Sequence, residues 1–320
     1  MENTTMENTT MENTRTKTTR NSLILLLTAA IWGMAFVSQS KGMDYMHPFT
    51  FNGVRSLIGA ASILVYILIS RKIAGDKAAP LDWKLNVKAG LLCGIFLTIA
   101  STLQQFGIKY TSVGKAGFIT TLYIIFVPMF GIFLKKKVAP VVWAAAVMAA
   151  VGMYLLCMTE SLRLGAGDIM VFLCAIAFAI QIMTVDHYAA RIDGAVVSCI
   201  QFTVCGVVCC IGALIWGQPT FGQLQEGLGA LLYAGVLSCG VGYTLQIVGQ
   251  KGLNPTVAAL IMSLESVIAT ISGWIAYKIG FLTTDQTLTA RQIAGCVIVF
   301  AAVILVQLPP EWFRFGKKNA

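Results

Sequence analysis

The chain is divided into ten long apolar segments by short polar connections, and this division limits its fold more than any other feature. Each segment is near the ~20 residues that an α-helix needs to cross a hydrocarbon core of ~30 Å. The apolar runs are continuous, so backbone hydrogen bonds must be made within helices and not between the strands of a β-barrel. We therefore predict an all-α integral membrane protein with ten transmembrane helices. The predicted spans are 22–40, 48–70, 85–107, 113–134, 140–158, 167–187, 195–216, 228–248, 254–277 and 290–307.

Composition excludes an ordinary soluble domain. Hydrophobic residues make up 57% of the chain and charged residues 12%, against roughly 25% charged residues in a typical soluble protein. The polar breaks at 109–112 and 251–254 are the weakest, so nine or eleven spans stay open as alternatives. The nine cysteines all fall within predicted spans and form neither a disulfide framework nor a Cys-x-x-Cys motif, so we expect no metal and no cofactor.

The positive charge follows membrane topology. Of 23 Lys and Arg residues, sixteen lie in the N-terminal segment, every second connection and the C-terminal tail, whereas the other connections hold six. Because cytoplasmic loops collect Lys and Arg, both termini are predicted to be cytoplasmic and the protein to lie in the cell (inner) membrane. The formal net charge of +9 is thereby explained without nucleic acid as a partner.

The two ends of the chain are polar. Residues 1–20 repeat the letters Met-Glu-Asn-Thr, and we expect a disordered cytoplasmic segment there. A cleaved signal peptide is disfavoured, because the apolar run that follows continues to Val37 without a small-residue cleavage site. Residues 309–320 are predicted to form a cytoplasmic tail.

An internal repeat links the two halves of the chain. Gln104, Gly107 and Lys109 recur as Gln246, Gly249 and Lys251, and the same offset of 142 residues pairs Thr121 with Ser263. We therefore predict two domains of five helices each, residues 21–160 and 161–308. A five-helix unit has an odd number of spans, so the second copy must enter the membrane from the opposite side. Such inverted repeats typically serve alternating access to a site near the bilayer midplane.

Five short stretches carry a family resemblance. They are Ala30-Ile31-Trp32-Gly33-Met34-Ala35-Phe36-Val37, His47-Pro48-Phe49, Tyr110 to Ile119, Ser263-Leu264-Glu265-Ser266-Val267 and Gln292-Ile293-Ala294-Gly295. Together they resemble the EamA-type family of the drug/metabolite transporter superfamily, over about residues 22–308. The resemblance implies ten helices as two inverted five-helix repeats. It also implies a secondary transporter, with or without proton coupling, that exports small metabolites or drug-like amphipathic solutes.

The chain departs from the family pattern at two places. The family often has Gly-Glu after the fourth and ninth spans, whereas Lys135-Lys136-Lys137 and Tyr277-Lys278-Ile279-Gly280 stand here. The resemblance therefore leaves the substrate open. It also leaves open whether the protein is a monomer or a homodimer in the lipid bilayer.

Two charged residues lie deep inside predicted spans. Glu265 is the only carboxylate near the middle of a span, and Arg55 is the only arginine well inside one. Because a charge at that depth costs roughly 2.5 to 3.5 kcal/mol on insertion scales, both are candidates for substrate binding. The alternative is a structural ion pair between Arg55 and Glu265.

Aromatic and amide side chains complete the candidate substrate site, with helix packing as the alternative role for each. Trp32 and Phe36 share a helix face, Tyr123 lies mid-span, and Asn52 shares a face with Arg55. Gln104, Gln181, Gln201, Tyr243 and Gln246 are further polar groups that need partners in lipid. All of these except Gln201 are assigned to the site.

An intramembrane enzyme and a channel are the rival classes. The chain has two histidines, His47 and His187, both at span ends, and it lacks the common motifs of hydrolases and nucleotide-binding proteins. Repeated filter segments of the kind found in channels are also missing from the sequence. A transporter of a small molecule is therefore favoured.

Overall fold

The computed structural model describes residues 2–75, 80–134, 138–157, 165–283 and 287–307. Within these ranges every regular element is helical, which confirms the all-α class. Eight helical stretches are long and apolar enough to cross a membrane. Two shorter apolar helices occupy the positions of the fifth and tenth predicted spans, so a count of ten crossings stays a prediction. The predicted tail over 309–320 lies outside the described residues.

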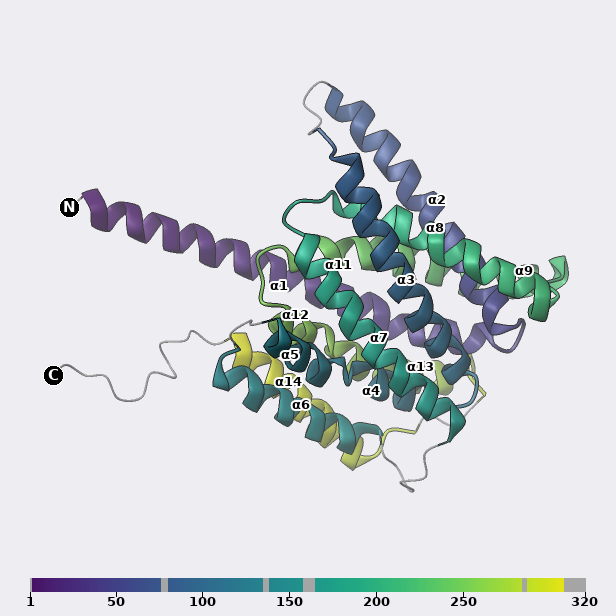
Figure 1. Cartoon of the computed structure of the whole chain (residues 1–320). Helices are drawn as coiled ribbons and strands as arrows, with labels where there is room; N and C mark the ends of the chain where they lie inside the picture. Colours follow the sequence, from purple (N-terminus) through teal and green to yellow (C-terminus); the bar gives the residue numbers. More distant parts are fainter. Residues whose placement is uncertain (1, 76–79, 135–137, 158–164, 284–286, 308–320) are drawn as a thin grey trace.

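The elements follow the predicted order of spans (Figure 1). The first half contains α1 (Glu2–Gly42), α2 (Pro48–Ala74), α3 (Trp83–Ile108), α4 (Val113–Thr121), α5 (Tyr123–Phe133) and α6 (Pro140–Cys157). The second half contains α7 (Ala166–Tyr188), α8 (Gly194–Gly212), the π-helical η2 (Ala213–Gly217), α9 (Phe221–Glu226), α10 (Leu228–Leu232), the π-helical η3 (Tyr233–Gly242), α11 (Tyr243–Gln250), α12 (Pro255–Met262), α13 (Leu264–Lys278) and α14 (Ala290–Gln307).

Residues 2–20, for which composition predicts disorder, form the first part of helix α1 in the structure. Helix α1 begins at Glu2 and continues without a break into the first apolar span, and Figure 1 shows its first part extending beyond the bundle. No glycine or proline precedes Gly33. The turns of the apolar span therefore propagate toward the N-terminus with nothing in the sequence to stop them, since adding a residue to an existing helix needs no new nucleation.

Polar side chains start several helices. Ser112 and Asn254, which are 142 residues apart, cap α4 and α12: their side-chain oxygens accept hydrogen bonds from the backbone N–H groups of Lys115 and Thr256. Each cap satisfies one of the N–H groups that a helix start leaves without a partner. The fourth and ninth predicted spans therefore begin at equivalent positions of the repeat.

His47 caps α2 in the connection before that helix. Its Nδ1 accepts a hydrogen bond from the backbone N–H of Phe49 at 3.4 Å, and Pro48 occupies the first helical position. Burial and the nearby charge of Lys109 lower the pKa of His47. The lowered pKa favours the neutral imidazole, which keeps the acceptor nitrogen that the cap requires.

The fourth and ninth spans are each broken near the middle. Helix α4 gives way to α5 at Leu122, and α12 gives way to α13 at Ser263. The hydroxyl of Thr121 donates to the carbonyl of Phe118, and that of Ser263 donates to the carbonyl of Leu260. These bonds are again 142 residues apart, and hydroxyl groups that bond back to the preceding turn are known to bend helices.

The two halves are packed together reciprocally. The third span of each half lies against the first span of the other, as α3 against α7 and as η3 with α11 against α1; α2 packs on α8, and α6 on α14. Small residues allow the close approach. A Cβ added at Gly107 would lie 2.8 Å from the carbonyl oxygen of Gly167, and one at Gly249 would lie 3.2 Å from that of Asn21.

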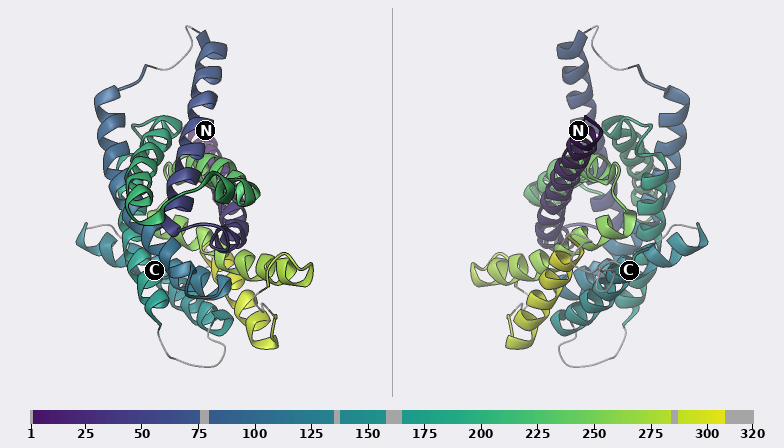
Figure 2. Two further views of the ribbon diagram at one scale, coloured as in Figure 1. Left: turned by 90° about the vertical axis from the view of Figure 1, so that its right-hand side faces the viewer. Right: turned by 90° about the vertical axis from the view of Figure 1, so that its left-hand side faces the viewer.

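The ends of the bundle differ in shape. In Figure 2 the end of α2 and the start of α3 reach past the rest of the molecule on one side, and α13 and α14 project on the other. The broken spans α4–α5 and α12–α13 pack on each other and on the first span of the opposite half. The breaks therefore lie in the interior, where the candidate site is found.

Candidate functional site

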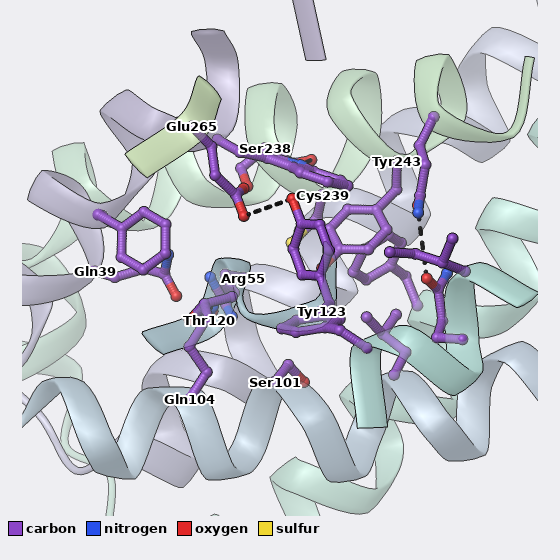
Figure 3. Close-up of a pocket in the computed structure, with 18 residues that line it drawn as sticks. Gln39, Arg55, Ser101, Gln104, Thr120, Tyr123, Ser238, Cys239, Tyr243 and Glu265 are labelled. Atoms are coloured by element: carbon purple, nitrogen blue, oxygen red, sulfur yellow. Dashed lines mark hydrogen bonds between the residues drawn. The ribbon is translucent and has the colours of Figure 1, made fainter. Parts of the chain in front are cut away.

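A small cavity lies among helices of both halves (Figure 3). Its volume is about 30 Å³, which is room for one or two water molecules. Nine of the ten predicted site residues line it, with Asn52 as the exception. The full lining is Trp32, Phe36, Gln39, Arg55, Leu97, Ser101, Gln104, Thr120, Tyr123, Phe178, Gln181, Ile182, Phe202, Ser238, Cys239, Tyr243, Gln246 and Glu265.

The broken spans bring their first residues to the cavity. Tyr123 opens α5 and Glu265 is the second residue of α13, so each stands directly after a break. The Tyr123 hydroxyl donates to Oε1 of Glu265 at 3.1 Å, as Figure 3 shows. These two residues are 142 positions apart in the chain. Repeat-related residues that touch each other lie where a two-fold axis between the halves would pass.

Glu265 is buried, and no cationic side chain of the described residues is paired with it. Glu265 is 3% exposed, and within the described residues its side chain accepts one hydrogen bond, from Tyr123. The alternative of an Arg55–Glu265 ion pair is not supported: among the described residues the ion pairs within 4 Å are Lys41–Asp44, Arg71–Asp193 and Lys115–Asp168. A carboxylate buried in this way is costly unless a proton or a cation neutralises it.

Asn52 and Phe51 fix the position of the Arg55 guanidinium. Arg55 Nε donates to Asn52 Oδ1 at 3.0 Å, and the guanidinium lies 5.6 Å from the centre of the Phe51 ring. Asn52 in turn donates to Ser101 Oγ at 3.1 Å. Asn52 therefore lies behind Arg55 rather than on the cavity wall, and it positions the guanidinium instead of facing the cavity itself.

Aromatic rings form much of the wall. The rings of Trp32 and Tyr243 lie 4.5 Å apart, and those of Tyr243 and Phe202 lie 4.9 Å apart with their planes nearly perpendicular. Trp32 Nε1 also donates to the backbone oxygen of Ser238 at 3.3 Å, which fixes the indole. Phe202 and Phe178 were not predicted, because a phenylalanine in an apolar span gives no sequence signal that separates a cavity wall from ordinary packing.

Glutamine side chains contribute polar groups in both halves. Gln246 Nε2 donates to Gln181 Oε1, and Gln104 Nε2 donates to Thr120 Oγ1, each at 3.2 Å. Three buried cavity atoms have no partner within the described residues: Gln39 Oε1, Gln181 Nε2 and Gln246 Oε1. Gln39 was missed from the sequence, although its offset of 142 from Gln181 was a usable signal.

The connections at the two ends of the bundle are tied down. Lys115 Nζ lies 2.6 Å from Asp168 Oδ2, and Thr111 donates to Asp168 Oδ1 at 2.9 Å, so the α3–α4 connection is held to the start of α7. At the other end Asn21 Nδ2 donates to the carbonyl of Lys251 at 2.7 Å, which holds the α11–α12 connection to α1. Both ties join an element of one half to an element of the other.

The cavity wall is suited to hydrogen bonding. In the part of the chain that the structure describes, no three His, Cys, Asp or Glu side chains gather as a metal site. The chemical groups that the wall offers are one guanidinium, one carboxyl, four amides, hydroxyls and aromatic faces. These groups can hold a small organic solute by its charge, its hydrogen bonds and its flat surfaces.

Comparisons with known proteins agree with one another. The sequence profile of the EamA-like transporter family matches residues 20–158 and again 165–308. An uncharacterized transporter of Archaeoglobus fulgidus is 27% identical over 89% of this chain and 84% of its own. The uncharacterized transporter YwfM of Bacillus subtilis is 24% identical over 91% of this chain and 94% of its own. A solved crystal structure has a TM-score of 0.71 at 16% identity, covering 92% of this chain and 99% of that one, and it shares the fold.

Proposed function

Because the chain belongs to the EamA-like transporter family, we propose that it is a secondary transporter that moves a small solute by alternating access, with the central cavity as the binding site. The observation that carries this proposal is a central cavity whose wall comes from both halves and contains Arg55 and Glu265. Ties at both ends favour a carrier over a channel, since a carrier must close one end before it opens the other.

The proposed mechanism uses an inverted repeat. Reciprocal packing of first and third spans, paired breaks in α4–α5 and α12–α13, and the Tyr123–Glu265 contact all support a two-fold relation between the halves. In such an arrangement the two ends of the cavity are built from equivalent parts. Opening one end and closing the other then exchanges the conformations of the two halves around a fixed site.

We assign Glu265 the coupling proton. The cost of burying its carboxylate is removed when it binds a proton, and the Tyr123 hydroxyl is placed to stabilise the ionised form when the proton leaves. A cationic group on the substrate would serve the same purpose and is the second candidate. Export of small metabolites or amphipathic solutes is the direction that the family resemblance favours.

Proteoliposomes test the function directly. Purified protein is reconstituted into proteoliposomes, and a pH difference is imposed across their membrane. A panel of labelled small solutes is then screened for saturable uptake and for counterflow. Counterflow is expected, because a carrier with bound substrate can change between its two conformations in either direction and so exchange labelled solute outside for unlabelled solute inside. Flux that rises linearly with solute concentration, without counterflow, would instead indicate a channel.

Topology gives a separate prediction. Alkaline phosphatase, which is active outside the cytoplasm, should be inactive when fused to the C-terminus and active when fused after Cys157, because α6 is then a crossing helix that ends outside. Green fluorescent protein fused to the same two places should show the opposite pattern. An inactive phosphatase after Cys157 would mean that the short helix α6 does not cross, and the ten-span topology would be wrong.

The ion pair of the α3–α4 connection gives another prediction. Asp168→Asn removes the charge that holds Lys115, so the outer end should open more often. A single cysteine at Ser101, in a background without other cysteines, should then react several-fold faster with a maleimide added from outside. Asp44→Asn is the matched control, because its bridge to Lys41 lies within one connection and joins no distant helices. Equal acceleration in both variants would exclude a gating role for Asp168.

A further inference from the structure

The guanidinium of Arg55 has hydrogen-bonding capacity to spare. Within the described residues its recorded bond is the one from Nε to Asn52, and no carboxylate lies within 4 Å of it. The residue is 5% exposed and lines the cavity. A guanidinium fork matches the two oxygens of a carboxylate, and a buried cation without an anion is costly. The side of Arg55 that faces the cavity therefore has the chemistry of an anion site.

The arginine is fixed in advance. Asn52, which accepts from Arg55 Nε, is itself bonded to Ser101 Oγ at 3.1 Å and to Cys209 Sγ at 3.2 Å. The ring of Phe51 lies on the guanidinium at 5.6 Å. Little side-chain entropy would be lost when an anion binds, because these contacts already order the guanidinium.

A neutral polar pair faces the cavity from the second half. Gln181 and Gln246 share one hydrogen bond, and each keeps one buried atom without a partner: Nε2 of Gln181, a donor, and Oε1 of Gln246, an acceptor. A ligand group that offers both an acceptor and a donor, such as a carboxamide, would satisfy the two atoms together.

The positive charge is confined to one half. Arg55 is seven residues after the start of α2, and the residue seven after the start of α8 is Gln201. Gln201 is fully buried and neutral. Counted from the helix starts, the first half therefore has an arginine where the second half has a glutamine. The part of the described cavity wall that comes from the second half carries amides and the Glu265 carboxyl but no cation.

Arg55 and the Gln181–Gln246 pair lie at different levels along the helix bundle. Gly107 of α3 lies at the level of Gly167 and Val171 of α7, and Ser101, which contacts Asn52, precedes Gly107 by six residues. Gln181 is then four to eight residues further along α7, or ~6–12 Å at 1.5 Å per residue. Aromatic rings occupy this part of the wall, among them Trp32 and Tyr243.

We propose that the substrate is a small organic anion with a flat apolar body, whose carboxylate or equivalent group is bound by Arg55 and whose other end carries a neutral amide-type group bound by Gln181 and Gln246. The proposal rests on the proposed function, since it takes the cavity to be the transport site and requires the cavity, which has room for one or two water molecules here, to widen when one end opens. It also gives the proton on Glu265 a role: with that carboxyl neutral, the cavity is positively charged before the anion enters.

A matched set of probes tests the charge requirement on the unaltered protein. Calorimetric titration in detergent should show binding of 4-acetamidobenzoate, with a loss of about tenfold or more in affinity for the uncharged methyl ester. Benzoate, which lacks the amide, and the zwitterion 4-(aminomethyl)benzoate should also bind more weakly. Failure of 4-acetamidobenzoate to bind at millimolar concentration, or tighter binding of the zwitterion or the ester, would overturn the proposal.

Variants then locate the anion. Arg55→Gln should abolish the preference for 4-acetamidobenzoate over its ester, and Arg55→Lys should keep part of it, whereas Arg71→Gln, at an exposed ion pair outside the cavity, should leave it unchanged. An unaltered preference in Arg55→Gln would overturn the assignment. Counterflow in proteoliposomes separates the two proposals: selective binding without any counterflow would refute transport and keep the anion site, whereas counterflow restricted to cations or zwitterions would refute the anion site and keep transport.

Discussion

Glu265→Gln should abolish the dependence of transport on a pH gradient and leave exchange of substrate across the membrane largely intact. Gradient-driven accumulation should fall by about 5- to 150-fold. This is the factor that corresponds to typical coupling free energies of about 1–3 kcal/mol between two ligands. The reason is structural: glutamine keeps the shape and can accept from the Tyr123 hydroxyl, whose bond to Glu265 is 3.1 Å long, but it cannot release a proton. Uptake and exchange are measured in the same proteoliposomes, with and without the gradient.

Tyr123→Phe is the matched companion to that variant. It removes the hydrogen bond to Glu265 and keeps the titratable group, so coupling should survive with a changed pH profile. If Glu265 instead holds a cationic part of the substrate, Glu265→Gln should weaken exchange and gradient-driven uptake alike. Wild-type behaviour of Glu265→Gln in both assays would contradict both roles of Glu265. The coupling or binding group would then have to be sought at Arg55 and the cavity glutamines.

Hydropathy was enough to predict the helical framework, because each span must be apolar over its whole length. It could not predict how a span is interrupted. Thr121 and Ser263 read as ordinary residues of continuous helices, and their bonds to Phe118 and Leu260 become visible only with the backbone in place. Over residues 2–20 composition favours disorder, whereas the structure continues helix α1 from the apolar span back to Glu2.

The polar residues of the cavity were recognisable because lipid makes them rare. Glu265 and Arg55 stood out by charge alone, and the structure brings both to one cavity. Their partners could not be read from the sequence: Glu265 is bonded to Tyr123 and Arg55 to Asn52, not to each other. Pairing depends on the direction of each side chain from its helix, which spacing along one helix does not determine.

Gly33→Val should prevent stable folding and abolish transport. A Cβ at this position would lie 2.6 Å from Ile268 Cβ and 2.7 Å from the backbone oxygen of Glu265. A side chain therefore meets the backbone of α13 at the level of the cavity, and α1 and α13 must separate. Overpacking of this kind costs typically about 1–3 kcal/mol, which is a large fraction of the roughly 5–15 kcal/mol that keeps proteins folded. The glycine between Trp32 and Met34 thus keeps the indole of Trp32 and the carboxyl of Glu265 in one cavity.

Folded yield by fluorescence-detected size exclusion, followed by transport of whatever folds, measures the effect. Gly33→Ala should be milder but still defective, because the first added carbon already meets the carbonyl of Glu265. Gly229→Val is the control: nothing lies within 4 Å of a Cβ there, and valine has a higher helix propensity than glycine, so the same substitution should not lower the folded yield. If Gly33→Val folds and transports as the wild type does, α1 and α13 must be further apart in the working protein, and the closed cavity between them would not be its transport site.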